Sequence, residues 1–170
     1  NSRLDDILKS ADIVIDALVG TGMKGALDGA MKSALEKVSS AKAKRPSMIL
    51  IALDVPSGLD ADGGVVDSSA LFCDMTITLA FPKIGLFQFP GASRVGKLVI
   101  ADIGIPGELA ADINIELMTD AWASSVLPRR PLNANKGSFG RVLVVAGSIN
   151  YIGAAYFACM GAYRVGAGLV

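Results

Sequence analysis

Four apolar runs of strand length divide the first hundred residues, and an amphipathic helix pattern separates the first run from the second. The runs lie at 12–19, 48–54, 75–80 and 97–102. Between the first two, apolar residues recur from Leu27 to Val38 at the spacing of one helix face. Nearly continuous apolar strands are typical of parallel sheets that are covered on both faces. The order of these elements therefore predicts an α/β fold with an open, mostly parallel sheet.

Shorter elements are predicted in the connections. Apolar residues from Leu4 to Leu8 predict a short helix that ends near Ser10. A second short helix is predicted at 119–127, with Thr119 suited to cap its first turn. The segment 82–96 contains too many glycine and proline residues for an α-helix, so we expect a loop there.

The last fifty residues differ from the rest in charge, and the strand–helix pattern restarts within them. Residues 1–120 hold all 16 acidic residues and 11 of the 16 basic ones, whereas the remainder holds five bases and no acid. A linker is indicated at 128–135, which contains two prolines and two asparagines. Beyond it we expect a strand at 141–146 and a helix at 152–164. We therefore assign two domains, 1–127 and 128–170, and expect the second segment to be too short to bury a core alone.

The composition excludes several classes of protein. Hydrophobic residues make up 52% of the chain and charged residues 19%, which is too apolar for a disordered protein. A pI of about 6.4 argues against a nucleic-acid binder, and no apolar run approaches the roughly 20 residues of a membrane span. The absence of histidine excludes His-dependent catalysis and His-ligated zinc within this chain. Cys73 and Cys159 stand alone, which indicates free thiols in a reducing, cytoplasmic compartment.

A glycine-rich turn at 20–25 follows the first predicted strand and fits the pattern G-x-G-x-x-G. Backbone amides in such a turn, ahead of a helix, suit phosphate oxygens, and Lys24 adds a positive charge. A dinucleotide site also needs an acid about 20 residues further on, but the next acid at a strand end is Asp54. Two interpretations stay open: a phosphate-contacting turn on a Rossmann-like sheet, and a turn that needs glycine only for its shape.

Two carboxylates are predicted at neighbouring strands of the sheet. Asp16 lies inside an apolar strand, where an ionised carboxylate needs a partner or a cation. Asp54 ends the next strand, at the edge where open parallel sheets bind ligands, and Ser57 follows in a tight turn. This set suits a cation site beside an acid/base residue, and the alternative is that Asp54 only caps its turn. Without histidine, Ser57 is not expected to be a conventional hydrolase nucleophile.

Taken together, these segments resemble the family of bifunctional NAD(P)H-hydrate repair enzymes, in which an epimerase domain precedes an ADP/ATP-dependent dehydratase domain. The segments 16–22, 54–60 and 83–85 are similar to successive epimerase motifs. The segments 136–148, 153–155 and 164–170 are similar to the opening of the dehydratase. The resemblance implies the C-terminal part of a Rossmann-like epimerase domain, followed by the first strand–helix unit of a ribokinase-like α/β domain.

The resemblance also implies a reaction and its residues. Hydrated NADH and NADPH exist as R and S epimers at C6 of the nicotinamide ring; the epimerase interconverts them, and the dehydratase removes water from the S form with ADP or ATP. By position, Asp54 is implied as the general acid/base that contacts the substrate, with Asp16 and Ser57 as ligands of a potassium ion. Further substrate contacts are implied at Gly20, Thr21, Gly22, Met23, Lys24, Gly25 and Ala26, and at Ala154 in the dehydratase.

Parts of both domains are expected outside this chain, namely an Asn-Asn-Gly-Gly-Asp loop upstream and the nucleotide site downstream. We therefore expect the 170 residues alone to have little or no activity. The longer protein is expected to be a homo-oligomer that acts on NADHX or NADPHX, without nucleic-acid or membrane partners. Three other interpretations stay open: a non-catalytic binding protein on the epimerase fold, like relatives known as apolipoprotein-binding partners; a ribokinase-like small-molecule kinase; and an NAD dehydrogenase.

Overall fold

The computed structural model describes residues 2–22 and 25–170 and divides the chain into two compact units. The first unit extends to Leu117 and the second begins at Met118. The assignment of domains at 1–127 and 128–170 stays a prediction, and the helix at 120–126 belongs to the second compact unit.

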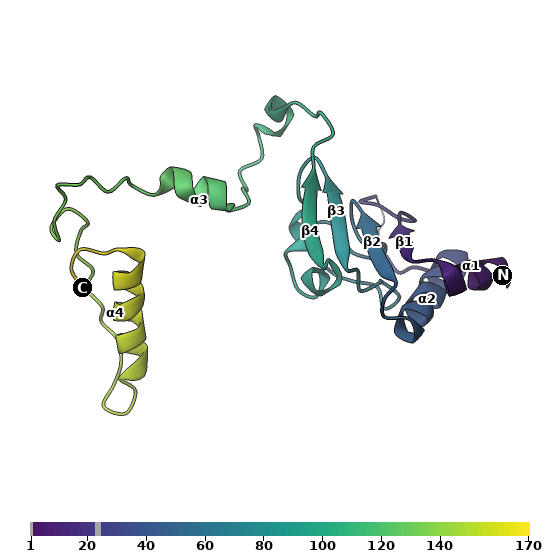
Figure 1. The fold of residues 1–170 in the computed structure, drawn as a ribbon, viewed down its shortest axis with the longest axis horizontal. Helices are drawn as coiled ribbons and strands as arrows, with labels where there is room; N and C mark the ends of the chain where they lie inside the picture. The colour runs from purple at the N-terminus through teal and green to yellow at the C-terminus, as the bar shows by residue number, and fades with distance from the viewer. Residues whose placement is uncertain (1, 23–24) are drawn as a thin grey trace. The chain divides into compact units, whose positions relative to one another are not determined.

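A sheet of four parallel strands forms the centre of the first unit, in the order β1-β2-β3-β4 (Figure 1). The predicted α/β class and parallel sheet are confirmed. Each strand is shorter than the apolar run that predicted it; β1, for example, ends at Asp16, where its pairing with Ala52 of β2 stops. The strands are β1 (Ile13–Asp16), β2 (Ile49–Leu53), β3 (Met75–Leu79) and β4 (Lys97–Ala101).

Two helices cover one face of this sheet. The helices are α1 (Ser2–Ser10) and α2 (Gly29–Lys44), and both were predicted from apolar spacing. Their apolar side chains pack against the alternate residues of β2 that point to this face. Cys73 lies in the same core, where burial and the charges of Asp16 and Asp74 raise the pKa of its thiol to about 12. The main members of this core are Leu8, Leu35, Val38, Met48, Leu50, Ala52 and Leu71.

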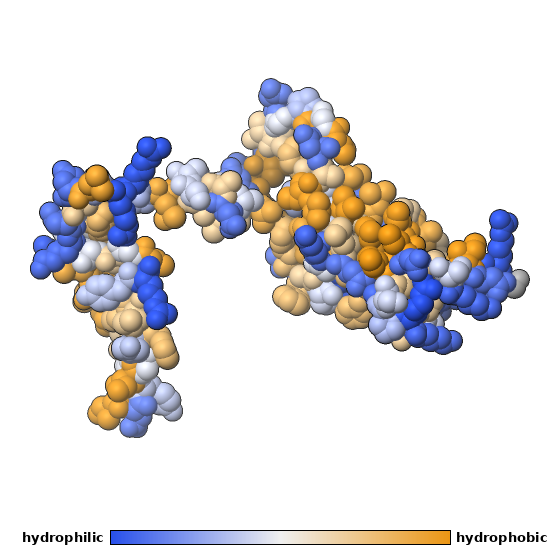
Figure 2. All heavy atoms as spheres, in the orientation of Figure 1, coloured by the Kyte–Doolittle hydropathy of each residue, from blue (hydrophilic) through white to orange (hydrophobic). Residues whose placement is uncertain are grey.

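The opposite face of β1 and β2 is exposed, so the expectation of a sheet covered on both faces was wrong for this unit. Ile13 and Ile15 are 55% and 64% exposed, and Ile49, the partner of Ile13, is 45% exposed. The reason is that α1 and α2 pack on the same face and no other α-helix is described within the unit. Figure 2 shows apolar atoms in patches over this unit.

The connections after β3 and β4 contain only single turns of 3₁₀ helix. These are η1 (Ile84–Leu86), η2 (Gly91–Arg94) and η3 (Gly107–Ala110). The absence of an α-helix from the described segment 82–96 confirms the prediction from its breakers. A second, smaller core lies beneath this connection and joins Val55 and Leu59 to Leu86 and Val95.

The second unit contains two helices, α3 (Asp120–Val126) and α4 (Gly153–Val165), and both were predicted. Thr119 caps α3 as expected, since its hydroxyl accepts a hydrogen bond from the Trp122 N–H at 3.1 Å. Gly166 ends α4 in the left-handed conformation, with φ of 104°.

The strand predicted at 141–146 is wrong for this structure, because only Arg141 forms a bridge there, with Leu169. A strand needs a hydrogen-bonded neighbour along its length, and the segment after α4 offers a bridge at one residue only. The buried apolar residues of the described chain all lie between Leu8 and Val95, so the prediction that 128–170 buries no core alone is confirmed. None of the described helices is long and apolar enough to cross a membrane.

Candidate active site

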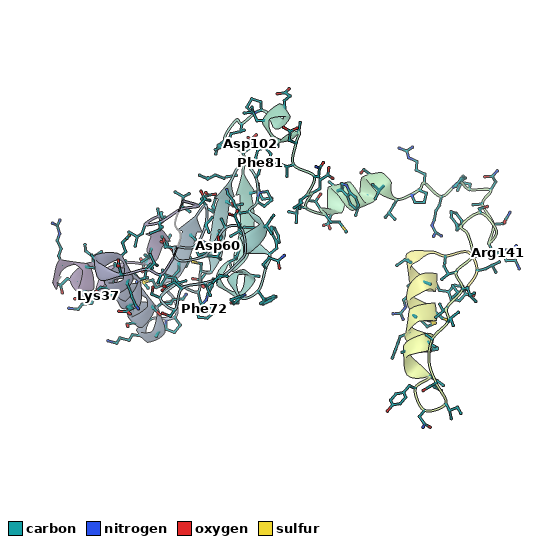
Figure 3. All side chains as sticks on the ribbon, turned by 180° about the vertical axis from the view of Figure 1, so that it is seen from behind. Lys37, Asp60, Phe72, Phe81, Asp102 and Arg141 are labelled. Carbon is teal, nitrogen blue, oxygen red and sulfur yellow. The ribbon has the colours of Figure 1, made fainter. Side chains whose placement is uncertain are left out.

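Polar residues gather at the carboxyl edge of the sheet in the first unit. Asp16 is the last residue of β1, and Asp54 directly follows β2. Because all strands are parallel, their carboxyl ends meet at one edge, which is where open α/β sheets bind ligands. Figure 3 labels Phe81 and Asp102, which follow β3 and β4 at this edge. The structure therefore places the two predicted carboxylates at the expected edge.

Asp16 and Ser57 are in direct contact. Asp16 is 3% exposed and Ser57 is fully buried. The Ser57 N–H donates to Asp16 Oδ2 at 2.8 Å, and the Ser57 hydroxyl donates to Oδ1 at 2.5 Å. Ser57 Oγ also accepts a hydrogen bond from the Val19 N–H at 3.0 Å. The pair therefore ties the end of β1 to the turn after β2, and sequence reasoning had placed both residues in one site.

The oxygen atoms of this corner are of the kind that binds a hard cation. The Asp16 carboxylate lies against the Ser57 hydroxyl, and the Val19 carbonyl oxygen lies 3.4 Å from Ser57 Oγ. Oxygen atoms of these three kinds are typical ligands of hard cations. No ion pair joins Asp16 to a basic side chain among the residues that the structure describes. Across the residues that the structure describes, no group of three His, Cys, Asp or Glu side chains lies close enough together to hold a metal ion. Asp16 and Ser57 thus fit as two oxygen ligands of a cation but do not form a complete site.

Asp54 has a backbone conformation that few residues with a side chain adopt. Its φ is +68°, and Ala80, which follows β3, has φ of +57°. These are the two non-glycine residues with positive φ among those described. Such conformations cost about 1–3 kcal/mol each and persist where the surrounding structure enforces them, which is often at functional sites. Here the Asp54 N–H donates to the Ile77 carbonyl at 2.7 Å, which holds the turn against β3.

The Asp54 carboxylate is held by three donors from β3 and the turn after it. Oδ1 accepts hydrogen bonds from the Leu79 N–H at 3.0 Å, from the Thr78 hydroxyl at 3.2 Å and from Lys83 Nζ. Burial raises the pKa of Asp54, but the hydrogen bonds from Lys83, Leu79 and Thr78 and the Lys83 charge outweigh it and set the pKa below its usual value. Asp54 is therefore ionised at neutral pH and in its proton-accepting form.

The loop after β1 lies beside a cavity of about 560 Å³. Gly25 and Ala26 line it from the loop, and Asp60, Asp62 and Asp67 line it from the segment after β2. Carboxylates favour hydrogen-bond donors such as ribose hydroxyls over phosphate oxygens. The described lining therefore gives no support to the interpretation of the loop as a phosphate contact.

The other predicted substrate contacts are placed only in part. Gly20, Thr21 and Gly22 are exposed in the loop after β1, and Gly25 has φ of +101°, which favours glycine. Met23 and Lys24 lie outside the described residues. Ala154 is exposed in the first turn of α4 and belongs to the second unit.

Sequence reasoning missed three residues that build this edge. It quoted Lys83 within a motif but gave it no role, and it did not single out Thr78 or Asp67. Asp67 accepts a hydrogen bond from the Leu27 N–H at 3.0 Å and so anchors the end of the loop that begins at Gly20. The available signal for Asp67 was its position two residues before Ser69, which is typical of an Asx turn.

Comparison with known proteins decides the family. Residues 1–85, half of the chain, match the family described as YjeF-related protein N-terminus. This chain belongs to the YjeF-related N-terminal family. The YjeF-related match includes Asp16, the loop after β1, Asp54, Ser57 and Lys83, so the contacts described above lie within it.

Three relatives are named bifunctional NAD(P)H-hydrate repair enzyme Nnr, and they confirm the resemblance seen in the sequence. The relative from Moorella thermoacetica is 45% identical over 99% of this chain and 31% of its own length. That from Dictyoglomus turgidum is 31% identical, with coverage of 96% and 31%, and that from Hyperthermus butylicus is 38% identical, with coverage of 94% and 28%. This YjeF-related chain thus spans less than a third of each relative. Among solved structures, yeast ynu0 is similar with a TM-score of 0.47 and 20% identity, over 64% of this chain and 42% of that chain.

Proposed function

We propose that the first unit belongs to an NAD(P)H-hydrate epimerase, which interconverts the R and S epimers of NADHX and NADPHX at C6. The observation that carries the proposal is the Asp54 carboxylate, held ionised at the carboxyl edge of the sheet by Leu79 and Lys83. The names of the relatives support the substrate class. The segment 128–170 is proposed to open an ADP/ATP-dependent NAD(P)H-hydrate dehydratase domain within the same longer protein.

The proposed reaction needs one group that can take up and return a proton. The C6–O bond breaks as the lone pair of the ring nitrogen forms a double bond to C6, and the hydroxyl leaves with a proton as water. Water then adds to the other face of C6 and gives up a proton. No electron is gained or lost. The departing hydroxyl takes its proton from solvent water. Asp54, ionised at the start, accepts the proton that the incoming water gives up and then returns it to solvent, so the carboxylate is regenerated and no net proton is consumed. This is general acid/base catalysis by one carboxyl group.

A potassium ion is proposed at Asp16 and Ser57. Bound there, such an ion would supply positive charge that compensates the buried carboxylate. The protein contributes two fixed oxygen ligands, because hydrogen bonds from the Ser57 N–H and the Val19 N–H hold the two side chains in place.

The potassium proposal is tested by Asp16→Ala in the full-length protein. We expect turnover of the parent to rise with potassium concentration and the variant to lose this dependence, because one of the two ligand side chains is absent. Steady-state rates at a series of potassium concentrations, with sodium holding the ionic strength constant, measure it. Asp12→Ala is the matched control, since Asp12 is exposed and lies before β1. An unaltered response in Asp16→Ala would place the ion elsewhere.

The function itself is tested by incubating purified (R)-NADHX with the full-length protein and with the 170-residue chain. We expect rapid formation of the S epimer with the full-length protein. Chromatographic separation of the two epimers at successive times measures this conversion. We expect little or no conversion above the spontaneous rate with the 170-residue chain, because the predicted upstream loop is absent from it. Conversion at the spontaneous rate by the full-length protein would refute the proposal, and a clear rate from the 170 residues would refute the predicted dependence on the upstream loop.

A further inference from the structure

The two oxygens of the Asp54 carboxylate are in different environments. Oδ1 accepts all three hydrogen bonds that the structure gives this side chain, from Leu79, Thr78 and Lys83. No described residue donates a hydrogen bond to Oδ2, although the side chain is only 23% exposed. One oxygen is therefore fixed by the protein, and the other is free to meet a ligand.

Lys83 is fully engaged by the protein at the same place. An ammonium group has three N–H donors. Lys83 Nζ donates to Asp54 Oδ1, to the Leu79 carbonyl at 2.9 Å and to Thr78 Oγ1 at 3.2 Å. With all three donors used on these partners, Lys83 has none left for a substrate.

The backbone of the connection fixes the position of Lys83. Lys83 lies between the end of β3 and the 3₁₀ turn η1. The Leu86 N–H of this turn donates to the Lys83 carbonyl at 3.1 Å. Gly85 packs directly on the segment after β2, where its N–H donates to the Ala61 carbonyl at 2.7 Å. The Lys83 side chain is 22% exposed, so the ion pair with Asp54 is partly shielded from water and salt.

We propose that Lys83 is a positioning residue, which holds Asp54 by Oδ1 so that Oδ2 points to the substrate and exchanges the proton at the C6 oxygen. The inference rests on the proposed epimerase function and adds to it a role for a residue outside the predicted site. Among the described residues, Lys83 is the one charged side chain paired with Asp54. Thr78 completes the arrangement, since it donates to Oδ1 and accepts from Lys83.

The test is Lys83→Met in the full-length protein, with kcat and KM for (R)-NADHX measured across a range of pH. Misplacement of a catalytic group costs roughly 10²-fold, so we expect kcat to fall by about that factor and KM to change much less. Removal of Lys83 takes away its hydrogen bond and its charge, two of the four causes that lower the pKa of Asp54. The pKa therefore rises and less of the carboxylate is ionised at acidic pH. The acidic limb of the kcat profile is therefore expected to move to higher pH. Lys83→Arg keeps the charge, so the acidic limb of its kcat profile is expected to lie close to that of the parent.

Lys42→Met is the matched control. Lys42 pairs with Asp74 at 2.8 Å, and Asp74 also accepts a backbone N–H, from Leu50 at 2.7 Å. This pair resembles that of Lys83 and Asp54 in its contacts, but Asp74 directly precedes β3, at the opposite edge of the sheet. Lys42→Met is expected to lower the Tm without changing kcat or the acidic limb.

The outcomes separate this inference from the function on which it rests. If Asp54→Asn abolishes turnover while Lys83→Met leaves kcat and the acidic limb unchanged, the positioning role alone is overturned. If kcat falls in Lys83→Met with a lower Tm and no movement of the limb, Lys83 is only structural and the inference again fails. Should Lys83→Met not fold, Lys83→Gln provides the same comparison with a similar length and no charge. If the parent itself does not epimerise (R)-NADHX, the proposed function fails first.

Discussion

Asp54→Asn in the full-length protein is expected to lower kcat/KM for epimerisation by about 10²–10⁴-fold, the usual contribution of a general acid/base group. An amide cannot take up the proton that the incoming water gives up. The substitution keeps the shape of the side chain and one oxygen that can accept the hydrogen bonds from Leu79 and Thr78. We therefore expect substrate affinity to change less than turnover. Rates of conversion of (R)-NADHX to the S epimer, and a separate binding measurement, distinguish the two effects.

Asp74→Asn is the control for this substitution. Asp74 is also paired with a lysine and a backbone N–H, and these hydrogen bonds likewise set the pKa of its carboxyl below the usual value. Because Asp74 lies at the other edge of the sheet, we expect the turnover of the Asp74→Asn variant to match that of the parent. Equal turnover in Asp54→Asn and in the parent would remove Asp54 as the acid/base group.

Gly85→Ala is expected to lower the free energy of unfolding by about 2–3 kcal/mol, the upper part of the range for overpacking a well-packed site. A methyl group at Gly85 would lie 2.1 Å from the Asp60 carbonyl oxygen and 2.8 Å from the Ala61 carbonyl carbon. Both are backbone atoms, so they cannot move aside as the end of a flexible side chain can. The change in the free energy of unfolding is measured by denaturant titration of the full-length protein, with a spectroscopic signal that reports on the first unit.

The same substitution is expected to reduce turnover, because the segment that carries Lys83 must shift with Gly85. Gly107→Ala is the control, since nothing lies within 4 Å of the position its methyl group would occupy. We expect that control to unfold within about 0.5 kcal/mol of the parent. A stability of Gly85→Ala equal to that of Gly107→Ala would show that the close approach of the two segments is not required.

The candidate site was predictable from sequence where local pattern and strand order suffice. Asp54 was placed at the ligand-binding edge because it ends an apolar run, whereas Asp16 was predicted inside the apolar run of the neighbouring strand. The structure shows both at this edge, because β1 ends at Asp16. The contact of Asp16 with Ser57 joins positions 41 residues apart, and it was foreseen only as shared ligation of a cation. Lys83 was not assigned a role, because its pairing with Asp54 depends on how the turn after β3 folds back over the end of β2.

The sequence by itself determined the class of fold, the four strands of the first unit and the four α-helices, because apolar periodicity and capping residues act over a few neighbouring positions. It also carried the family resemblance, which the comparisons confirm. Tertiary structure alone decided which oxygen of Asp54 is held, that Lys83 and Thr78 hold it, and that one face of β1 and β2 is exposed. It also decided that 141–146 forms no strand, since strand formation depends on a partner that local pattern does not supply.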